Sequence, residues 1–287
     1  MLELYDRLSK ESADICGLVL TSSGLSFKSR KGLAGWSIWV DERHYPDARR
    51  VIARYFEENR WSPPLPEDVP VSKTRSSYAG VWAALLLAVF YFFTSGTLDG
   101  QTVWAAFGAS AEKIMSGEIF RTVTALMLHA DMAHLTGNMA GMALFGSAVC
   151  SVAGWGVGSL MILFSGALGN LANALVYQNG HLSIGASTAV FGAVGFLSGC
   201  QFIRKRQAGV RRFAAWLPIA GGLALLAMLG AGLHVDITAH FFGFFSGIIL
   251  GVLFAVLAVR PPNTHIQAAC LAICIFLIFF SWGWGLF

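Results

Sequence analysis

Apolar residues are concentrated after position 77, where they form seven long runs separated by short polar segments. Each run approaches the roughly 20 residues that a helix needs to cross the hydrocarbon core of a bilayer. The predicted spans are 78–95, 132–150, 157–177, 186–203, 213–232, 238–258 and 266–285. The pattern therefore predicts an all-α polytopic membrane protein over this part of the chain.

The interval between the first and second spans, residues 95–131, is long. Apolar residues such as Val103 and Phe107 occur there beside charged residues such as Glu112 and Arg121. Because charges inside a span are costly, the mixture favours a segment that lies in the membrane interface instead of crossing the bilayer. We therefore expect a long first loop.

Residues 1–60 have the composition of a small soluble domain and predict an α+β unit. The segments GLVLT (17–21) and WSIWV (36–40) are rich in β-branched and aromatic residues, which are typical of strands. Pro46 and Asp47 predict the start of a helix. The apolar face expected for that helix comprises Ala48, Val51, Ile52, Tyr55 and Phe56.

The sequence WSPPLPEDVP is rich in proline and predicts an extended linker over residues 61–77. The predicted organisation is thus a small α+β cytoplasmic domain at 1–60, the linker, and a core of six transmembrane helices at 78–260. An additional C-terminal transmembrane helix is expected at 261–287.

Composition supports a membrane protein. Hydrophobic residues make up 55% of the 287 positions and charged residues 13%, against about 25% charged in soluble domains. The start, MLELYDRLSK, lacks the basic stretch and apolar run of a cleavable signal peptide. The net charge of +4 gives no indication of a nucleic-acid partner. The five cysteines show no metal-ligand spacing, so we expect free thiols and neither a metal nor another cofactor.

Lysine and arginine residues predict the orientation of the spans. Lys73 and Arg75 precede the first span, and Arg260 lies between the sixth and seventh. Five more lie between the fourth and fifth spans: Arg204, Lys205, Arg206, Arg211 and Arg212. These intervals share one side of the membrane, which the positive-inside rule assigns to the cytoplasm. The second, fourth and sixth spans then run from the outside to the inside.

Four polar residues near the starts of these three spans need an explanation, because strongly polar groups inside a membrane usually face a cavity or each other. His134 and Asn138 share one face of the second span, Ser187 opens the fourth span and His240 opens the sixth. All four are therefore expected at a similar depth, just beneath the outer surface.

Small residues at a spacing of four continue below two of these polar groups. Gly195 and Gly199 follow Ser187 and Phe191 on the fourth span, and three glycines follow His240 on the sixth: Gly243, Gly247 and Gly251. Such stripes let two helix backbones approach closely. If the stripes face each other, the Ser187 hydroxyl meets the His240 imidazole, which is the nucleophile–base arrangement of serine catalysis. Phe191 could then pack against the imidazole.

Each of these signals also has a structural explanation. A serine at a helix start is most often a cap, a lone histidine can be a structural hydrogen-bonding group, and a glycine stripe alone indicates packing. A transporter or channel could use the same residues, but it would need polar groups through the inner half, where the sequence has few. A metal site with His134 and His240 would lack a third ligand on the facing helices.

Three motifs, in their order along the chain, resemble the rhomboid family. LHADMAHLTGNM resembles the HxxxN motif of the second helix, GAS (185–187) resembles GxSx of the fourth, and AHFFGFFSG resembles AHxxGxxxG of the sixth. The resemblance covers roughly residues 78–260 and implies a rhomboid-like bundle of six core helices. The N-terminal part is more loosely similar to the cytoplasmic domain of some bacterial members, which implies an inner-membrane protein with its active site toward the periplasm.

The resemblance implies an intramembrane serine endopeptidase that cleaves single-span transmembrane substrates near their outer end, surrounded by membrane lipids. Ser187 would be the nucleophile and His240 the general base, acting as a dyad because no acidic residue lies at that depth. His134 and Asn138 would stabilise the oxyanion. Supporting roles fall to Gly185, Phe191, Gly243, Gly247 and Arg121.

The sequence departs from the family pattern at three positions. Thr188 stands where many members have a glycine, Phe191 replaces a frequent tyrosine, and Phe120 replaces the tryptophan of a Trp-Arg pair whose Arg121 is retained. Inactive relatives lack the serine or the histidine, and both are present here. A catalytically silent, rhomboid-like binding protein stays open as the alternative.

Overall fold

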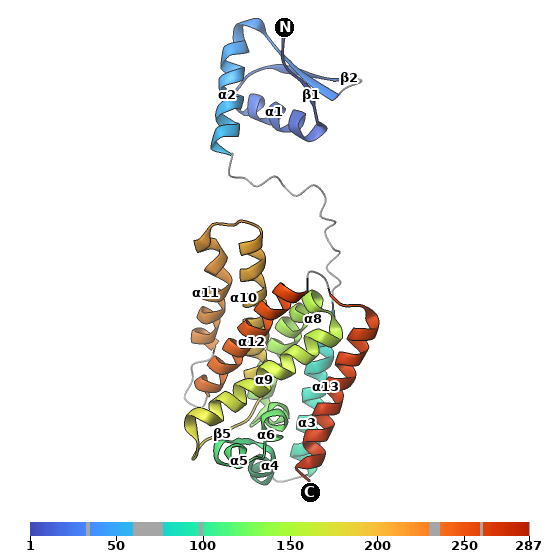
Figure 1. Ribbon diagram of the computed structural model, residues 1–287, viewed down its shortest axis with the longest axis vertical. Helices are drawn as coiled ribbons and strands as arrows, with labels where there is room; N and C mark the ends of the chain where they lie inside the picture. The colour runs from blue at the N-terminus through green and yellow to red at the C-terminus, as the bar shows by residue number, and fades with distance from the viewer. Residues whose placement is uncertain (33–34, 60–76, 98–99, 230–235, 259–260, 287) are drawn as a thin grey trace. The chain divides into compact units, whose positions relative to one another are not determined.

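The computed structural model describes residues 1–32, 35–59, 77–97, 100–229, 236–258 and 261–286 (Figure 1). The chain divides into two compact units, Met1–Ser72 and Lys73–Phe287, and each is treated by itself. The predicted linker lies almost entirely outside the described residues.

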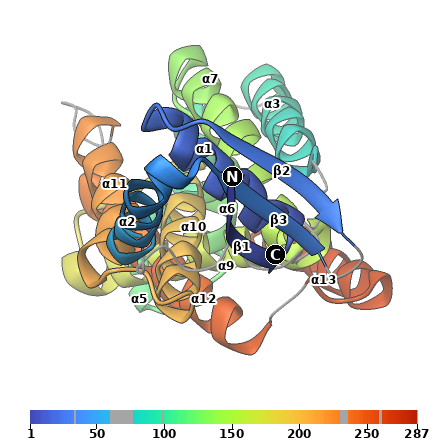
Figure 2. The same cartoon turned by 90° about the horizontal axis from the view of Figure 1, so that it is seen from above.

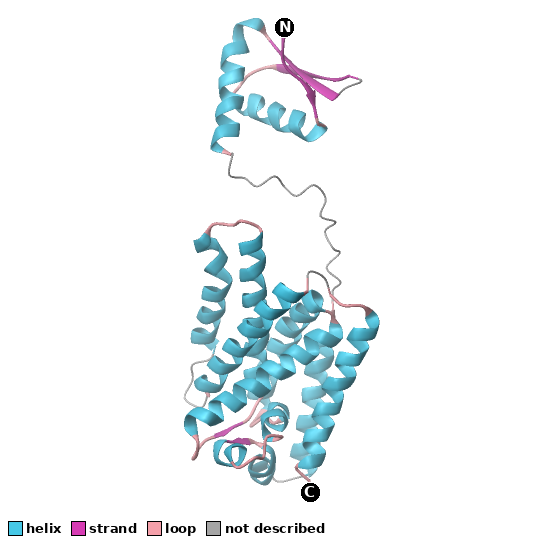
Figure 3. Cartoon of the chain, viewed as in Figure 1, coloured by secondary structure: helices cyan, strands magenta, loops and turns pink. Residues whose placement is uncertain are grey.

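The first unit is a small α+β domain, as the sequence predicted. Its elements are β1 (Leu2–Leu8), α1 (Lys10–Ser22), β2 (Phe27–Gly32), β3 (Gly35–Val40), a 3-10 turn η1 (Glu42–His44) and α2 (Tyr45–Glu58). The strands form an antiparallel sheet of order β1-β3-β2, against which both helices pack (Figure 3). Leu20, Ile38 and Ile52 are fully buried between sheet and helices.

Two details of this unit were predicted wrongly. The segment GLVLT is the C-terminal half of α1 and not a strand, because Ala13, Cys16 and Leu20 bury one face at helical spacing. Phe56 is 44% exposed, since it lies in the last turn of α2 beyond the core. Trp36–Val40 does form a strand, and Pro46 lies in the first turn of α2.

The second unit contains helices at all seven predicted spans. They are α3 (Ala79–Thr97), a continuous run of α7 (Met132–Gly141), η3 (Met142–Gly146) and α8 (Ser147–Ala153), then α9 (Trp155–Tyr177), α10 (Ser187–Gln207), α11 (Arg212–Leu229), α12 (Ile237–Leu257) and α13 (Thr264–Trp284). By length and apolarity, five of the described helices could cross a bilayer: α7–α8, α9, α11, α12 and α13. The chain is an all-α, multi-pass integral membrane protein with a small α+β region.

The two remaining helices, α3 and α10, are not among these five. Among the described side chains of α3, the apolar stretch is Ala79–Ser95. Helix α10 ends in a basic turn that contains Arg204, Lys205 and Arg206, which lowers its hydropathy. In space α10 packs against α9, α11 and α12, and α13 packs against α9 (Figure 2).

The long interval after α3 folds into short elements gathered at one end of the bundle (Figure 1). They are α4 (Gly100–Phe107), β4 (Ala109–Ser110), α5 (Ala111–Met115), α6 (Arg121–Thr124) and η2 (Ala125–Met127). Each described element is too short to span a membrane. Strand β4 pairs with β5 (Leu182–Ser183), the segment just before α10, so this first loop lies against the start of α10.

The C-terminal helix α13 is fixed to the bundle by a buried glutamine. Gln267 Oε1 accepts hydrogen bonds from the backbone N–H groups of Gly156 (2.8 Å) and Val157 (2.9 Å), and Gln267 Nε2 donates to the carbonyl oxygen of Ala153 (3.0 Å). The N–H groups at a helix start have no partner within the helix. Gln267 therefore caps α9 and joins α13 to the turn between α8 and α9.

Candidate active site

Ser187 is the first residue of α10, and the chain before it is held on both sides. Strand β5 pairs with β4, and the N–H of Gly185 donates to the carbonyl oxygen of Ala125 (2.9 Å). Gly185 has a φ of +122°, a conformation that side chains strongly disfavour. The turn thus presents the Ser187 hydroxyl at the positive end of the α10 dipole.

His240 lies in the first turn of α12. Asp236 caps this helix, because its Oδ1 accepts from the N–H of Ala239 (2.9 Å) and its carbonyl oxygen accepts from the N–H of His240 (3.1 Å). The His240 side chain is only 5% exposed. The cap therefore fixes where the imidazole enters the bundle.

The structure brings Ser187 and His240 into hydrogen-bond contact. Ser187 Oγ and His240 Nε2 are 2.6 Å apart. Phe191, one turn further along α10, packs on the imidazole with ring centroids 4.8 Å apart and an interplanar angle of 34°. In the tautomer with Nε2 unprotonated, the hydroxyl donates to the imidazole, which is the arrangement needed to deprotonate a serine.

Glycines let α10 and α12 approach closely enough for that contact. Gly247 lies against the carbonyl of Gly192, and Gly251 lies against the carbonyl of Phe196. On the other side, a side-chain carbon at Gly195 would collide with the carbonyl of Phe244. The two glycine stripes therefore face each other along the helix pair.

Gly243 also explains how the threonine after Ser187 is accommodated. The carbonyl oxygen of Thr188 lies directly against Gly243. A side-chain carbon at Gly169 of α9 would lie 2.6 Å from Thr188 Cγ2 and 2.7 Å from the backbone nitrogen of Gly243. Gly169 of α9 and Gly243 of α12 thus leave room for the Thr188 side chain.

His134 and Asn138 face the turn that precedes Ser187. A side-chain carbon at Gly185 would lie 2.6 Å from His134 Nε2 and 3.6 Å from Asn138 Nδ2. Nδ1 of His134 accepts from the N–H of Ala130 (3.4 Å), so the neutral ring carries its proton on Nε2, the nitrogen beside Gly185. Asn138 Nδ2 donates to the carbonyl oxygen of His134 (3.1 Å), and an amide nitrogen has a second hydrogen to offer.

His129, which precedes the second predicted span, lies beside this group. Its ring meets that of His134 edge to face, with centroids 5.1 Å apart, and it is 5% exposed. Burial, reinforced by the neighbouring His134, lowers the pKa of His129 to about 4, although a backbone hydrogen bond at Met127 acts in the opposite direction.

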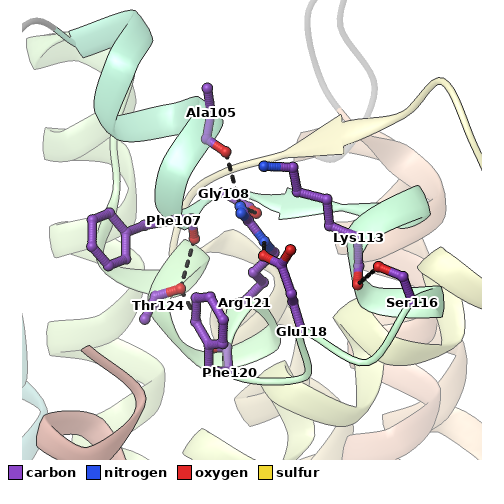
Figure 4. Close-up of polar contacts among 9 residues, drawn as sticks. All are labelled: Ala105, Phe107, Gly108, Lys113, Ser116, Glu118, Phe120, Arg121 and Thr124. Atoms are coloured by element: carbon purple, nitrogen blue, oxygen red, sulfur yellow. Dashed lines mark hydrogen bonds and ion pairs between the residues drawn. The ribbon is translucent and has the colours of Figure 1, made fainter. Parts of the chain in front are cut away.

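Arg121 does not contact the serine–histidine pair and instead holds the first loop together (Figure 4). Its Nε donates to Glu118 Oε2 (2.6 Å), and one terminal nitrogen donates to the carbonyl oxygens of Ala105 (3.0 Å) and Gly108 (3.1 Å). The side chain is almost fully buried, with the Phe120 ring 5.4 Å from its guanidinium carbon. Arg121 therefore has a structural position in this loop.

A second polar cluster, around Asp236, has no counterpart in the sequence prediction. Asp236 Oδ2 accepts from Asn173 Nδ2 (2.8 Å) and lies 2.6 Å from His181 Nε2. Burial alone would raise the pKa of the Asp236 carboxyl, but hydrogen bonds from Ala239, His181 and Ser183 hold it below its ordinary value. Asp236 as a helix cap was readable from its place before an apolar run, whereas its partners were not.

The described residues contain no group of three or more histidine, cysteine or acidic side chains placed to hold a metal ion. A cavity of about 730 Å³ lies between α3, α9 and α13. Its lining includes Ala186 and Ala189 of the serine segment but neither Ser187 nor His240. The cavity is therefore separate from the serine–histidine pair.

Residues 116–257, which contain all four polar residues of the site, match the rhomboid domain. The chain is similar to RHOMBOID-like protein 1 of Arabidopsis thaliana, with 32% identity over 48% of this chain and 35% of the relative. It is also similar to the putative rhomboid protease YdcA of Bacillus subtilis (26% identity; 49% and 69%) and to the rhomboid protease GluP of the same organism (30% identity; 43% and 24%). The chain thus spans about a third of the length of the first of these relatives.

Proposed function

The chain belongs to the rhomboid family of intramembrane proteases, and we propose that it is an active serine endopeptidase with Ser187 and His240 as a catalytic dyad. The observation that carries this proposal is the distance of 2.6 Å between Ser187 Oγ and His240 Nε2. Nucleophile and base within hydrogen-bond reach are the first geometric requirement of covalent catalysis.

In the proposed first step, His240 Nε2 takes the proton of the Ser187 hydroxyl while Oγ attacks the scissile carbonyl carbon. General-base help of this kind contributes about 10²–10⁴-fold to the rate. His240 then returns the proton to the leaving amine, which leaves an acyl group on Ser187. Water, deprotonated by His240, hydrolyses that ester and restores the serine.

The tetrahedral intermediate carries a negative oxygen that needs hydrogen-bond donors. His134 Nε2, Asn138 Nδ2 and the backbone N–H of Ser187 are the donors we propose, and the first two flank Gly185 in the turn before the serine. One such donor contributes roughly 2.7–4 kcal/mol to the transition state. The N-terminal end of α10 favours the same negative charge.

We further propose that the substrate is itself a single-span membrane protein cleaved near its outer end. With a cytoplasmic N-terminus, the positive-inside rule places the starts of α10 and α12 toward the periplasmic side of a bacterial inner membrane. A protease needs an extended backbone, so the substrate helix must unwind locally. Glycine or proline near the cut lowers that cost.

The test is cleavage of a model single-span substrate by the full-length protein in detergent, together with labelling by a fluorophosphonate. Ser187→Ala and His240→Ala are expected to lose both cleavage and labelling. Ser198→Ala is the matched control, because this buried serine on the same helix hydrogen-bonds to the carbonyl oxygens of Val194 and Pro218 and is expected to leave activity in place. Cleavage that survives in Ser187→Ala, or its absence from the unchanged protein, contradicts the proposal; the latter outcome favours the silent binding protein.

A further inference from the structure

Two members of the polar cluster around Asp236 lie close in sequence to the serine–histidine pair, one before Ser187 and one before His240. His181 precedes Ser187 by six residues, and Asp236 precedes His240 by four, which is about one helical turn. Nε2 of His181 and Oδ2 of Asp236 are 2.6 Å apart. Two contacts therefore join the segment that bears the serine to the helix that bears the histidine: Ser187–His240 and His181–Asp236.

Asp236 uses each carboxylate oxygen differently. Oδ1 caps α12 through the N–H of Ala239, and Oδ2 contacts Asn173 of α9 and His181 of the segment before α10. Capping alone requires only the first contact. The second oxygen therefore ties the start of α12 to two other parts of the bundle.

His181 is itself held in place. The ring of Tyr177 stacks on it with centroids 3.9 Å apart and an interplanar angle of 8°. The Tyr177 hydroxyl lies 3.1 Å from Thr238 Oγ1 in the first turn of α12, and the carbonyl oxygen of His181 accepts from the N–H of Ala111 (2.9 Å) in the first loop. The imidazole is therefore fixed in orientation as well as in position.

We propose that His181 and Asp236 form a positioning pair that sets the distance between Ser187 and His240. This inference rests on the proposed function. Neither residue touches the reacting atoms. The pair acts by fixing the position of the first turn of α12, along the helix axis, relative to the segment that presents the serine. Displacements of about 1 Å at reacting groups can lower rates by about 100-fold.

The test separates this role from capping. Asp236→Asn keeps a good helix cap but removes the carboxylate, whereas Asp236→Ala removes both. His181→Phe keeps a ring that can stack on Tyr177 but has no N–H. The matched control is Asn263→Ala, because Asn263 caps α13 through the N–H of Ile266 (3.1 Å), far along the chain from the dyad.

For Asp236→Asn and His181→Phe we expect kcat for substrate cleavage to fall about 10- to 100-fold with little change in KM and a melting temperature near that of the unchanged protein. The double variant is expected to be no slower than the slower single variant, because both remove one interaction. Asn263→Ala should lower the melting temperature without this loss of kcat. If Asp236→Asn keeps the kcat of the unchanged protein, the positioning pair is overturned. It is also overturned if the losses of kcat in the two single variants multiply in the double variant.

A second readout does not depend on activity. The imidazole ¹⁵N resonances of His240 in the full-length protein should move in Asp236→Asn and stay in place in Asn263→Ala. Unmoved resonances in Asp236→Asn overturn the positioning pair even in a preparation that cleaves nothing. Failure of the proposed function is recognised separately, by activity that survives in Ser187→Ala.

Discussion

The Ser187 hydroxyl and the His240 imidazole, 53 residues apart in the chain, lie 2.6 Å from each other. They stand at the N-terminal ends of α10 and α12, two helices whose backbones are in contact. Gly247 of α12 lies against the carbonyl of Gly192 of α10 in this contact. Any side chain at the contact must push the helices apart. The hydrogen bond between the two residues therefore depends on glycines two turns away from it.

Gly247→Ala is expected to lower cleavage at least 10-fold and to lower the melting temperature, since the added carbon would press on the backbone of α10. Gly221→Ala is the control, because nothing lies within 4 Å of a carbon added at that exposed position of α11. Cleavage kinetics and thermal unfolding in detergent measure both effects. Equal behaviour of the two variants would contradict a tight contact.

Gly185→Ala is expected to remove most activity through two effects. The φ of +122° disfavours a side chain, and the added carbon would lie 2.6 Å from His134 Nε2, one of the proposed oxyanion donors. Gly180→Ala shares a positive φ, +66°, but has open space around the added carbon. Comparison of fluorophosphonate labelling rates isolates the contact with His134; a loss of similar size in Gly180→Ala would point to backbone strain alone.

Gln267→Ala is expected to destabilise the bundle by roughly 1–3 kcal/mol, because the N–H groups of Gly156 and Val157 would be left buried without a partner. Gln207→Ala, at an exposed position near the end of α10, is expected to have little effect. Unfolding in a denaturing detergent gives the difference. Equal stability of both variants would show that Gln267 does not anchor α13.

Arg121→Ala is expected to disorder the first loop at a cost of roughly 3 kcal/mol, since the carbonyls of Ala105 and Gly108 lose their buried donor. The exposed pair Arg54–Glu58 provides the comparison, and Arg54→Ala should cause no measurable change. Amide hydrogen exchange over residues 100–127 reports the loop directly. Unchanged protection there would contradict this structural position.

Acid is expected to destabilise the protein through His129. Its pKa is about 4 in the folded protein and near 6.5 when unfolded, so the stabilising effect is complete above pH 6.5 and is lost as the pH falls toward 4. The loss approaches about 3 kcal/mol. His129→Phe should flatten the dependence of the melting temperature on pH in this range. A dependence identical to that of the unchanged protein would assign the effect to other groups.

Helices occur at all seven predicted positions, and five of the described ones are long and apolar enough to cross a bilayer, because an apolar run of about 20 residues is a local property. The facing of α10 and α12 was also readable, since Gly195 and Gly247 belong to stripes at a spacing of four. Local patterns of this kind survive folding because the bilayer requires every span to satisfy its own backbone.

The N-terminal unit was harder to predict. GLVLT looks like a strand, but Leu20 is buried as part of a helical face, and a short apolar run cannot distinguish the two. Strand β2 is mostly exposed and polar, so it has no apolar pattern to detect. It is a strand because it pairs with β3, which is a non-local interaction.

The positioning pair could not be predicted for a related reason. His181 and Asp236 lie 55 residues apart, on a short strand-like segment and at a helix start. Only the fold of the first loop against β5 and the packing of α9 bring them together. Their contact is a property of tertiary structure that neither residue's local sequence carries.

Carbonyl groups of α10 and α12 lie against glycines of the opposite helix, so the pair cannot separate without opening a void along its length. If the chain cleaves peptides as proposed, a substrate would therefore enter while these two helices remain together. Under the proposed function, the movement that admits it belongs to elements outside this helix pair. Sequence changes outside the α10–α12 contact would then alter which substrates enter, and how fast, while the chemistry proposed for Ser187 stays the same.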